Sequence, residues 1–263
     1  MRGSDGTVPL AIDALTVDYG AHRAVQSLSI EVRPGEIYGL LGSNGAGKSS
    51  TIKSIVGLVR PTSGSVRVFG DDAIGDGVRA KERLGYVPET ALLYEALTPR
   101  EFLEFVAGVR HLDRTVASER LRTYAAAFQL GAELEEPIAT LSNGTRQKVL
   151  VIAALLHAPR LLVLDEPLNS LDPRSVRIVK ELLVRFARGG GRGVLLSTHT
   201  MEIAEELCDR VGILDQGLLR AEGTLAELRT RAARGDASLE EVFLRLTRQD
   251  EGLAEAVASL DGP

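Results

Sequence analysis

The stretch Gly42–Ser49, GSNGAGKS, determines the predicted fold of this sequence. It matches the pattern G-x-x-x-x-G-K-[ST], in which glycines let backbone N–H groups converge on phosphate oxygens without interference from a Cβ atom. A short apolar run, Glu36–Leu41, precedes it, and a segment with helical apolar spacing, Lys48–Val59, follows it. A helix that starts at such a turn adds the positive end of its dipole. This context favours a phosphate-binding loop over a chance glycine-rich turn.

Two side chains of the loop have specific chemistry. Lys48 can reach the β- and γ-phosphates of a nucleoside triphosphate as a point charge, and the Ser49 hydroxyl can hold Mg²⁺. The residues expected to contact nucleotide are Gly42, Ser43, Asn44, Gly45, Ala46, Gly47, Lys48, Ser49 and Ser50.

A pair of acids follows a second apolar run. The aliphatic residues Leu161–Leu164 predict a buried strand, and Asp165 and Glu166 come directly after it. Ligands of α/β folds bind at the carboxyl ends of strands. Asp165 is suited to hold Mg²⁺, directly or through water, and Glu166 to polarise a water in line with the γ-phosphate as general base. A strand followed by a solvated acidic turn is the alternative, and the phosphate loop favours the catalytic interpretation.

Strand and helix patterns divide the chain into successive parts. Alternating apolar and polar residues from Leu10 to Phe69 predict a small antiparallel sheet joined to the strand–loop–helix unit. The pattern becomes helical from about Leu97 to Leu156, and Thr98–Glu101 is a capping box with proline at the first helical position. Strands and helices then alternate, which predicts a mostly parallel sheet with covering helices. The tail, Leu225–Leu260, has a helical pattern that is polar on one side.

The composition excludes some functions. The chain has 263 residues, 44% of them hydrophobic, and its net charge of −5 gives no support to nucleic-acid binding. The longest aliphatic run, Val149–Leu156, is far shorter than the roughly 20 residues that span a bilayer, so we expect any membrane attachment to go through a partner. The single cysteine, Cys208, fits a small buried hydrophobe in a reducing compartment.

The segment Leu141–Gln147, LSNGTRQ, narrows the choice among ATPases. It precedes a predicted helix and, with the phosphate loop and the acidic pair, resembles the LSGGQ signature of ABC ATPases. Ser142 occupies a helix N-cap, where its hydroxyl and the following N–H groups form an anion site. The resemblance implies that Ser142, Asn143 and Gly144 meet the γ-phosphate of ATP held by a second subunit, so that two molecules sandwich two nucleotides. An N-cap without a ligand is the alternative.

Further matches follow in the order of that family, and the resemblance covers roughly Leu10 to Leu246. Tyr19 stands where an aromatic ring stacks on adenine, although a buried or edge-strand tyrosine would show the same pattern. Leu171-Asp172 resembles the D-loop, which contacts the opposite subunit. His199 resembles the switch histidine, which contacts the γ-phosphate and the catalytic glutamate.

Four positions depart from the family pattern. Glu89 replaces the glutamine that usually ends the Q-loop, and because Mg²⁺ accepts carboxylates readily we expect Glu89 to act as a metal ligand. Asn143 and Thr145 replace a glycine and a glutamine of the signature, and asparagine tolerates a left-handed backbone. Ser170 replaces the D-loop glycine.

The expected fold is an α/β P-loop NTPase with a RecA-like parallel core, an N-terminal antiparallel β subdomain and an inserted helical subdomain. We expect an ABC ATPase domain over residues 8–225, with the helical subdomain at about 90–158, and a helical C-terminal tail over 226–263. Glu166, Lys48 and His199 are the expected catalytic residues, and ATP and Mg²⁺ are the expected ligands.

The expected function is ATP hydrolysis that closes and reopens a dimer and so powers a transporter. The resemblance implies a homodimer or heterodimer bound to membrane-spanning permease subunits encoded separately, in the cytoplasm on the inner face of the cell membrane, with no nucleic acid. The segments Gly223–Leu228 and Ser238–Phe243 resemble the tails of bacterial exporters with separate ATPase and membrane chains, which favours export over uptake. A tail that only packs on the core is the alternative.

Two other functions stay open. The first is a non-transport ABC ATPase that acts in DNA repair, chromosome organisation or translation. The gap from Lys48 to Leu141 lacks coiled-coil heptads, one cysteine cannot build a zinc site, and only one phosphate loop is present. The second is a nucleotide-binding regulatory subunit with weak turnover, which Glu89 keeps open.

Overall fold

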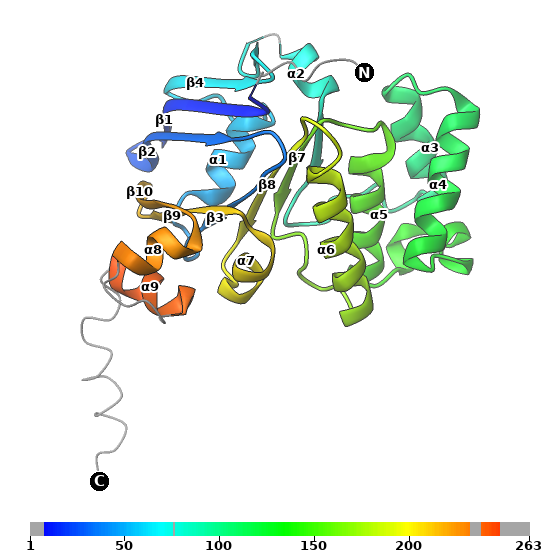
Figure 1. Ribbon diagram of the computed structural model, residues 1–263. Coiled ribbons are helices and arrows are strands. Elements are labelled where there is room, and N and C mark those ends of the chain that lie inside the picture. The colour runs from blue at the N-terminus through cyan, green and yellow to red at the C-terminus, as the bar shows by residue number, and fades with distance from the viewer. Residues whose placement is uncertain (1–7, 76, 232–237, 248–263) are drawn as a thin grey trace.

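Two β-sheets organise the computed structural model, which describes residues 8–75, 77–231 and 238–247 (Figure 1). The first sheet has four antiparallel strands in the order β2-β1-β4-β5. Alternating buried and exposed side chains along its strands leave one face on the core. Its strands are β1 (Leu10–Tyr19), β2 (His22–Val32), β4 (Ser63–Val68) and β5 (Asp71–Asp72).

The second sheet has six strands in the order β10-β9-β3-β8-β7-β6, all parallel except β10. Its central strands are buried along their whole length, as expected for a parallel sheet covered on both faces. The carboxyl ends of β3, β8 and β7 therefore lie at one edge, which is where α/β sheets bind ligands. Its strands are β3 (Ile37–Leu41), β6 (Leu84–Val87), β7 (Leu161–Asp165), β8 (Gly193–Thr198), β9 (Arg210–Asp215) and β10 (Leu218–Gly223).

Helices cover the parallel sheet on both faces. Helix α1 (Lys48–Ile55) packs between the antiparallel sheet and β7, and α6 (Pro173–Ala187) and α7 (Met201–Leu207) pack on β3 and β8. A short helix, α2 (Val78–Glu82), packs on β5 and β6. The phosphate loop, between β3 and α1, thus lies where the two sheets meet.

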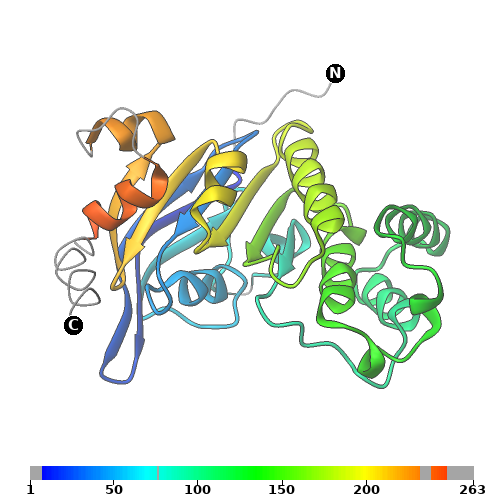
Figure 2. The same ribbon diagram turned by 90° about the horizontal axis from the view of Figure 1, so that it is seen from below.

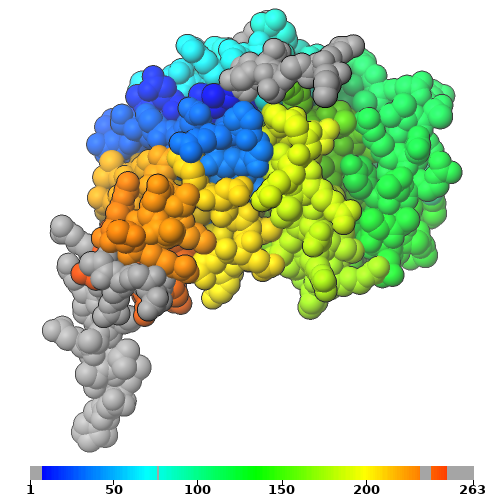
Figure 3. Space-filling model, viewed as in Figure 1, coloured from blue at the N-terminus to red at the C-terminus, as the bar shows by residue number. Residues whose placement is uncertain are grey.

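Two further groups of helices lie at opposite ends of the molecule, as Figures 1 and 2 show. The helical subdomain at one end contains α3 (Pro99–Val109), α4 (Arg114–Phe128) and α5 (Asn143–Leu156), with two 3₁₀ turns at Ala132–Glu135 and Ile138–Thr140. The other end contains α8 (Leu225–Arg231) and α9 (Leu239–Leu246). Figure 3 shows α8, in orange, directly against the core.

The predicted architecture is confirmed, and most element boundaries agree with it. The capping box is present: Thr98 accepts a hydrogen bond from the Glu101 amide, and the Glu101 side chain accepts one from the Thr98 amide. The predicted burial of Cys208 is also confirmed, and burial raises the pKa of its thiol to about 12.

Other predictions were incomplete or wrong. Helix α1 ends at Ile55, before the predicted Val59. Strands β5, β6 and β10 and helix α2 were missed. The tail is not one helix to Leu260, since Ser238 has extended backbone and caps α9; residues 248–260 of that prediction lie outside the described residues.

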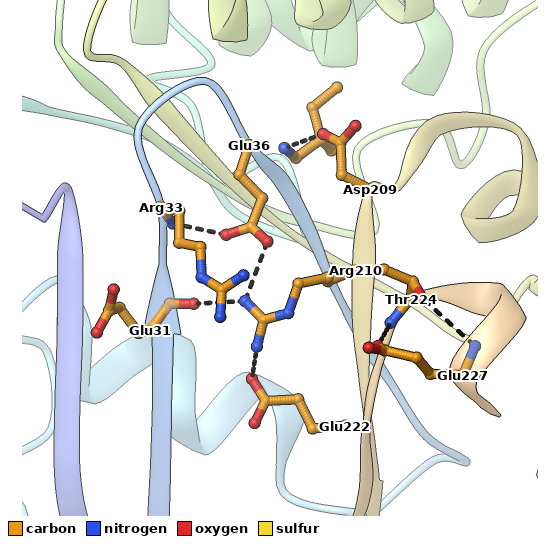
Figure 4. Close-up of polar contacts among 9 residues, drawn as sticks. Glu31, Arg33, Glu36, Asp209, Arg210, Glu222, Thr224 and Glu227 are labelled. Atoms are coloured by element: carbon orange, nitrogen blue, oxygen red, sulfur yellow. Dashed lines mark hydrogen bonds and ion pairs between the residues drawn. The ribbon is translucent and has the colours of Figure 1, made fainter. Parts of the chain in front are cut away.

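A largely buried ion cluster joins the two sheets (Figure 4). The Arg210 guanidinium donates to the carboxylate of Glu36 at 3.0 Å and to that of Glu222, and lies 5.4 Å from the ring centroid of Tyr38. It also lies within hydrogen-bond distance of the Glu31 carbonyl of β2, at 3.5 Å. Because the cluster connects β2, β3, β9 and β10, it fixes the antiparallel sheet against the core.

His157, which follows α5, is partly buried. Its Nε2 lies 3.0 Å from the carbonyl oxygen of Leu84 and therefore donates to it. Burial first, and then the positive charge of Arg110, lowers the pKa of His157 to about 4. This hydrogen bond joins the helical subdomain to β6, and burial and Arg110, not the bond itself, favour the neutral imidazole.

We expect the folded protein to lose stability as the pH falls from about 6.5 to 4, by about 2 kcal/mol from His157 alone. In that window the unfolded chain binds a proton on His157 and the folded chain does not, so folding is favoured above the window and penalised below it. Urea unfolding of wild type and His157→Gln at several pH values would measure this difference. His111→Asn, at an exposed histidine, is the control; parallel pH profiles for wild type and His157→Gln would contradict the expectation.

Candidate functional site

The phosphate loop ends in a helix start that has no acceptor for its amides. Gly47 caps α1 with no side-chain hydrogen bond, and the first turn holds no acidic residue. Gly47 has φ +109°, and a Cβ there would lie 2.4 Å from the carbonyl oxygen of Ala24. Only glycine fits this turn, which leaves the N–H groups of the first turn directed at a potential anion.

Lys48 is buried at the centre of the loop. Its Nζ donates to the carbonyl oxygen of Gly42 at 2.7 Å and to that of Ser43 at 3.3 Å, and lies 3.9 Å from Oε1 of Glu166. Burial lowers the pKa of the Lys48 ammonium, and the nearby carboxylates, Glu166 first, oppose that effect. The loop therefore holds a partly desolvated cation over the helix start.

The two acids at the carboxyl end of β7, Asp165 and Glu166, have different surroundings. Asp165 is buried, and one of its oxygens accepts a hydrogen bond from the hydroxyl of Ser197, its direct neighbour on β8. Its second oxygen is not held by that bond. Ser197 was not predicted from the sequence. The feature that could have indicated it is its position in strand β8, two residues before His199.

Glu166 adopts a left-handed backbone, φ +49°, which is uncommon for a residue other than glycine. Its Oε1 lies 2.8 Å from Nδ1 of His199, which follows β8. Since neighbouring parallel strands end together, Glu166 and His199 meet at the same sheet edge as Lys48. A carboxylate held by an imidazole and facing a lysine is a geometry suited to general-base chemistry.

A cavity of about 400 Å³ opens over the loop. It is lined by residues 43–50 and by Tyr19, Glu89 and Glu166, so these sequence-predicted residues come together. Tyr19, at the end of β1, is 46% exposed, which excludes a buried core role. His22 also lines the cavity and was missed; its pairing with Tyr19 across the β1–β2 hairpin brings it there.

Ser142, Asn143 and Gly144 do not line this cavity. Ser142 caps α5 as predicted, accepting from the Thr145 amide at 3.1 Å. Helix α5 packs on β6 and on α3 and α4, whereas α1 packs on the antiparallel sheet and β7, and Figure 1 shows the two helices well separated. The two helix starts that were predicted to bind anions thus lie apart within the chain.

The signature and the D-loop touch each other within the chain. A Cβ on Gly144 would lie 2.6 Å from the carbonyl oxygen of Ser170. Ser170 has φ +65°, the conformation that a glycine would adopt more easily, so the D-loop backbone is kept at some cost in strain. Asp172 caps α6 and pairs with Lys148 at 2.9 Å, and hydrogen bonds from Ser175 hold the pKa of its carboxyl well below the usual range.

The other residues at the start of α5 have local structural roles, including Asn143 and Thr145, which depart from the family pattern. Asn143 is the first residue of α5, so the left-handed conformation that asparagine tolerates is not used. The Thr145 hydroxyl lies 2.9 Å from that of Ser142. Gln147 is buried and donates to the carbonyl oxygen of Pro167, which ties α5 to the turn after Glu166.

The loop fits a triphosphate, because its glycine turn, its uncapped helix start and its buried ammonium all favour an anion. Ser49, Asp165 and Glu89 are oxygen donors near it, of the type Mg²⁺ prefers. Among residues 8–75, 77–231 and 238–247, no group of three or more His, Cys, Asp or Glu side chains could hold a metal ion. A cation here would need phosphate oxygens as further ligands, which is usual for Mg²⁺.

Within the part of the chain that the structure describes, no helix is both long enough and apolar enough to span a bilayer.

Comparison with known proteins agrees with this geometry. A family model described as ABC transporter matches residues 25–169. The chain is 38% identical to the ABC-type transporter ATP-binding protein EcsA of Bacillus subtilis, over 92% of this chain and 98% of that protein. It is 36% identical to the linearmycin resistance ATP-binding protein LnrL of Bacillus subtilis, over 92% of this chain and 76% of that protein. A solved structure described as an ATP-binding subunit of an ABC transporter superposes with a TM-score of 0.86 at 35% identity, covering 90% of this chain and 99% of that one.

We expect Gly144→Ala to reduce ATP hydrolysis by about 100-fold, because a Cβ would push the start of α5 away from Ser170 and misplace its amides. ATP binding to the isolated chain should stay unchanged, since Gly144 does not line the loop cavity. Phosphate release and calorimetric titration with ATP measure the two effects. Gly108→Ala in α3, where nothing lies within 4 Å of an added Cβ, is the matched control; equal activities of the two variants would contradict the expectation.

Proposed function

This chain belongs to the ABC transporter family of ATP-binding proteins, and from that premise we propose that it hydrolyses ATP to drive export through a membrane transporter. ABC ATP-binding subunits dimerise and work with membrane permeases. The supporting observation is the arrangement of three side chains at one sheet edge. Glu166 lies 2.8 Å from the imidazole of His199 and 3.9 Å from the ammonium of Lys48, beside the phosphate loop.

Nucleotide binding in this proposal depends on the loop. The amides of the α1 start and the Lys48 ammonium receive the β- and γ-phosphates, and Lys48 exchanges its carbonyl partners, Gly42 and Ser43, for phosphate oxygens. The half-exposed ring of Tyr19 offers a stacking surface for the base. Ser49, Asp165 and Glu89 would hold Mg²⁺, which neutralises charge on the β- and γ-phosphates.

Glu166 is the proposed general base. Its carboxylate takes a proton from a water as the water oxygen bonds to the γ-phosphorus, and the bond from that phosphorus to the β–γ bridging oxygen breaks, giving ADP and phosphate. The hydrogen bond from His199 fixes one carboxylate oxygen, so that the other can face the water. The buried surroundings of Glu166 strengthen these interactions.

Dimerisation supplies the missing half of the site. Ser142, Asn143 and Gly144 form an anion site that cannot reach the loop of the same chain. A second copy, or a related chain, would place its Ser142 amides over the γ-phosphate. ATP would then hold the two chains together until hydrolysis removes that phosphate.

An exposed apolar patch on the helical subdomain is the proposed permease contact. We define this patch as Leu92, Tyr94, Phe105 and Val109, which are each at least half exposed. Tyr94 and Phe105 make an edge-to-face contact with ring centroids 5.7 Å apart. Contiguous exposed apolar residues mark interaction surfaces, and the patch follows Glu89 closely in the chain, which connects it to the nucleotide cavity.

Export is supported by one relative and by the tail, whose sequence resembles the tails of bacterial exporters. One relative is described by its part in linearmycin resistance, and removal of a toxic compound is the simplest function of a transporter with that effect. We place the permease on separate chains, as for relatives named ATP-binding proteins of a transporter, and the ATPase on the inner face of the membrane, where ATP is present.

We expect Glu166→Gln to bind ATP with wild-type affinity and to hydrolyse it about 10²–10⁴-fold more slowly, because the amide keeps the shape but cannot accept the proton. The variant should also accumulate as an ATP-bound dimer. Phosphate release, ATP titration and size-exclusion chromatography with ATP and Mg²⁺ measure these effects.

Glu119→Gln, at an exposed glutamate of α4, is the matched control and should keep wild-type turnover. Near-normal turnover in Glu166→Gln would remove the assigned base. A wild-type protein that binds ATP and releases no phosphate would instead support the regulatory alternative.

We expect Phe105→Glu to release the protein from membranes of the source cells by more than about tenfold, because a charge replaces a half-exposed aromatic contact. The ATPase activity of the purified variant should not change. Membrane sedimentation followed by immunoblotting measures the shift. Val78→Glu, at an exposed apolar residue of α2 outside the patch, should stay membrane-bound; release of both variants alike would contradict a specific contact.

A further inference from the structure

The segment that contains His199 has little local support. It joins β8, which ends at Thr198, to α7, which begins at Met201 and has seven residues. The N-cap of α7, Thr200, makes no side-chain capping bond. A helix this short has no stability of its own in water, so its position depends on what packs against it.

His199 itself is only partly enclosed. Half of its side chain, 51%, is exposed. Its ring forms a hydrogen bond with the carboxylate of Glu166. One hydrogen bond leaves the imidazole free to tilt about that bond unless the backbone beneath it is fixed.

The tail helix α9 packs against α7. It is amphipathic and capped by a complete capping box, Ser238 with Glu241. Its apolar side chains, Leu239, Val242 and Phe243, are almost completely buried in the main hydrophobic core. The tail is therefore built to stay in place, and α7 is one of the surfaces that receive it.

A single carboxylate on α7 binds both tail helices. One oxygen of Glu205 accepts a hydrogen bond from the backbone amide of Leu239, at the start of α9, at 2.7 Å. The same oxygen lies 3.0 Å from the guanidinium of Arg229 in α8. Glu205 is partly buried, so these contacts are less screened than those of a surface ion pair.

The tail also borders the reaction site. A hollow of about 390 Å³ is lined on one side by Gly42 and Ser43, the first residues of the phosphate loop, and by His199. Phe243 and Leu244 of α9 line its other side. Tail, switch histidine and phosphate loop thus face one space, although α9 is far from the loop in sequence.

We propose that α9 is a positioning element for the switch histidine: by packing on α7, with the Glu205 contact and with Phe243 beside the same hollow as His199, it fixes the segment that holds His199 against Glu166. This inference depends on the proposed hydrolysis by Glu166. Phe243 is a positioning residue here, since it acts through α7 and His199 and touches no nucleotide in the proposed mechanism.

The decisive measurement is the imidazole of His199 in the nucleotide-free protein. The chain has four histidines, so ¹⁵N-histidine NMR gives few signals, and His199→Ala assigns the one of interest. We expect Phe243→Ala to shift and broaden the His199 signal and to leave that of His157, which follows α5, unchanged. Leu15→Ala, a similar truncation of a fully buried side chain in the antiparallel sheet, should move neither signal.

Kinetics provide a second readout. We expect Phe243→Ala to lower kcat on the order of tenfold, since small misplacements of catalytic groups cost that much or more. The Kd for ATP should stay within about twofold, because a change confined to positioning does not remove uniform binding. Phe243→Leu, which refills most of the volume, should restore both kcat and the His199 signal.

Glu205→Ala tests the same position without a cavity in the core, and Glu206→Ala, its neighbour on α7 that pairs with Lys180, is the matched control. An unchanged His199 signal in Phe243→Ala and Glu205→Ala would overturn the proposal, as would equal disturbance of His157. If His199→Ala keeps wild-type kcat, the proposed function of this histidine fails. If His199→Ala is slow while the tail variants are normal, only the positioning role fails.

Discussion

At the start of α1, backbone amides without an acceptor and a buried ammonium share one turn, and the neighbouring elements are arranged to keep that turn open. Gly47 adopts its left-handed conformation because it has no Cβ, and the Ala24 carbonyl oxygen occupies the space that a Cβ would need. Lys48 is desolvated, and the loop carbonyls and the Glu166 carboxylate compensate part of its lost hydration. The result is a preformed anion site that costs little reorganisation when phosphate arrives.

The parallel sheet brings chemistry to this site from three separate segments. Strands β3, β7 and β8 are neighbours, so the loop, Glu166 and His199 follow strand ends at the same edge. Ser197 holds one oxygen of Asp165, and His199 holds one oxygen of Glu166. In both acids a residue on or just after β8 binds one oxygen and leaves the other available, as the proposed binding of metal and water requires.

The two ends of the molecule have different tasks around that centre. The helical subdomain bears the Ser142 helix cap and the exposed apolar patch, the two features that we propose to contact other chains. At the other end, Glu205 of α7 binds both tail helices, α8 and α9. The Arg210 cluster keeps the antiparallel sheet, and with it Tyr19, in a fixed place relative to the loop.

Local chemistry determined much of this protein from its sequence: the loop pattern, the Asp165–Glu166 strand end, and the helix caps at Thr98 and Ser142 follow from neighbouring residues alone. Short strands such as β6 and β10 were missed because they owe their pairing to distant partners. Tertiary structure alone decided that His22 joins the cavity, that Ser170 keeps a left-handed backbone, and that α9 faces His199. The physical reason is range: capping and turn geometry depend on a few adjacent residues, whereas these contacts depend on how whole sheets and helices pack.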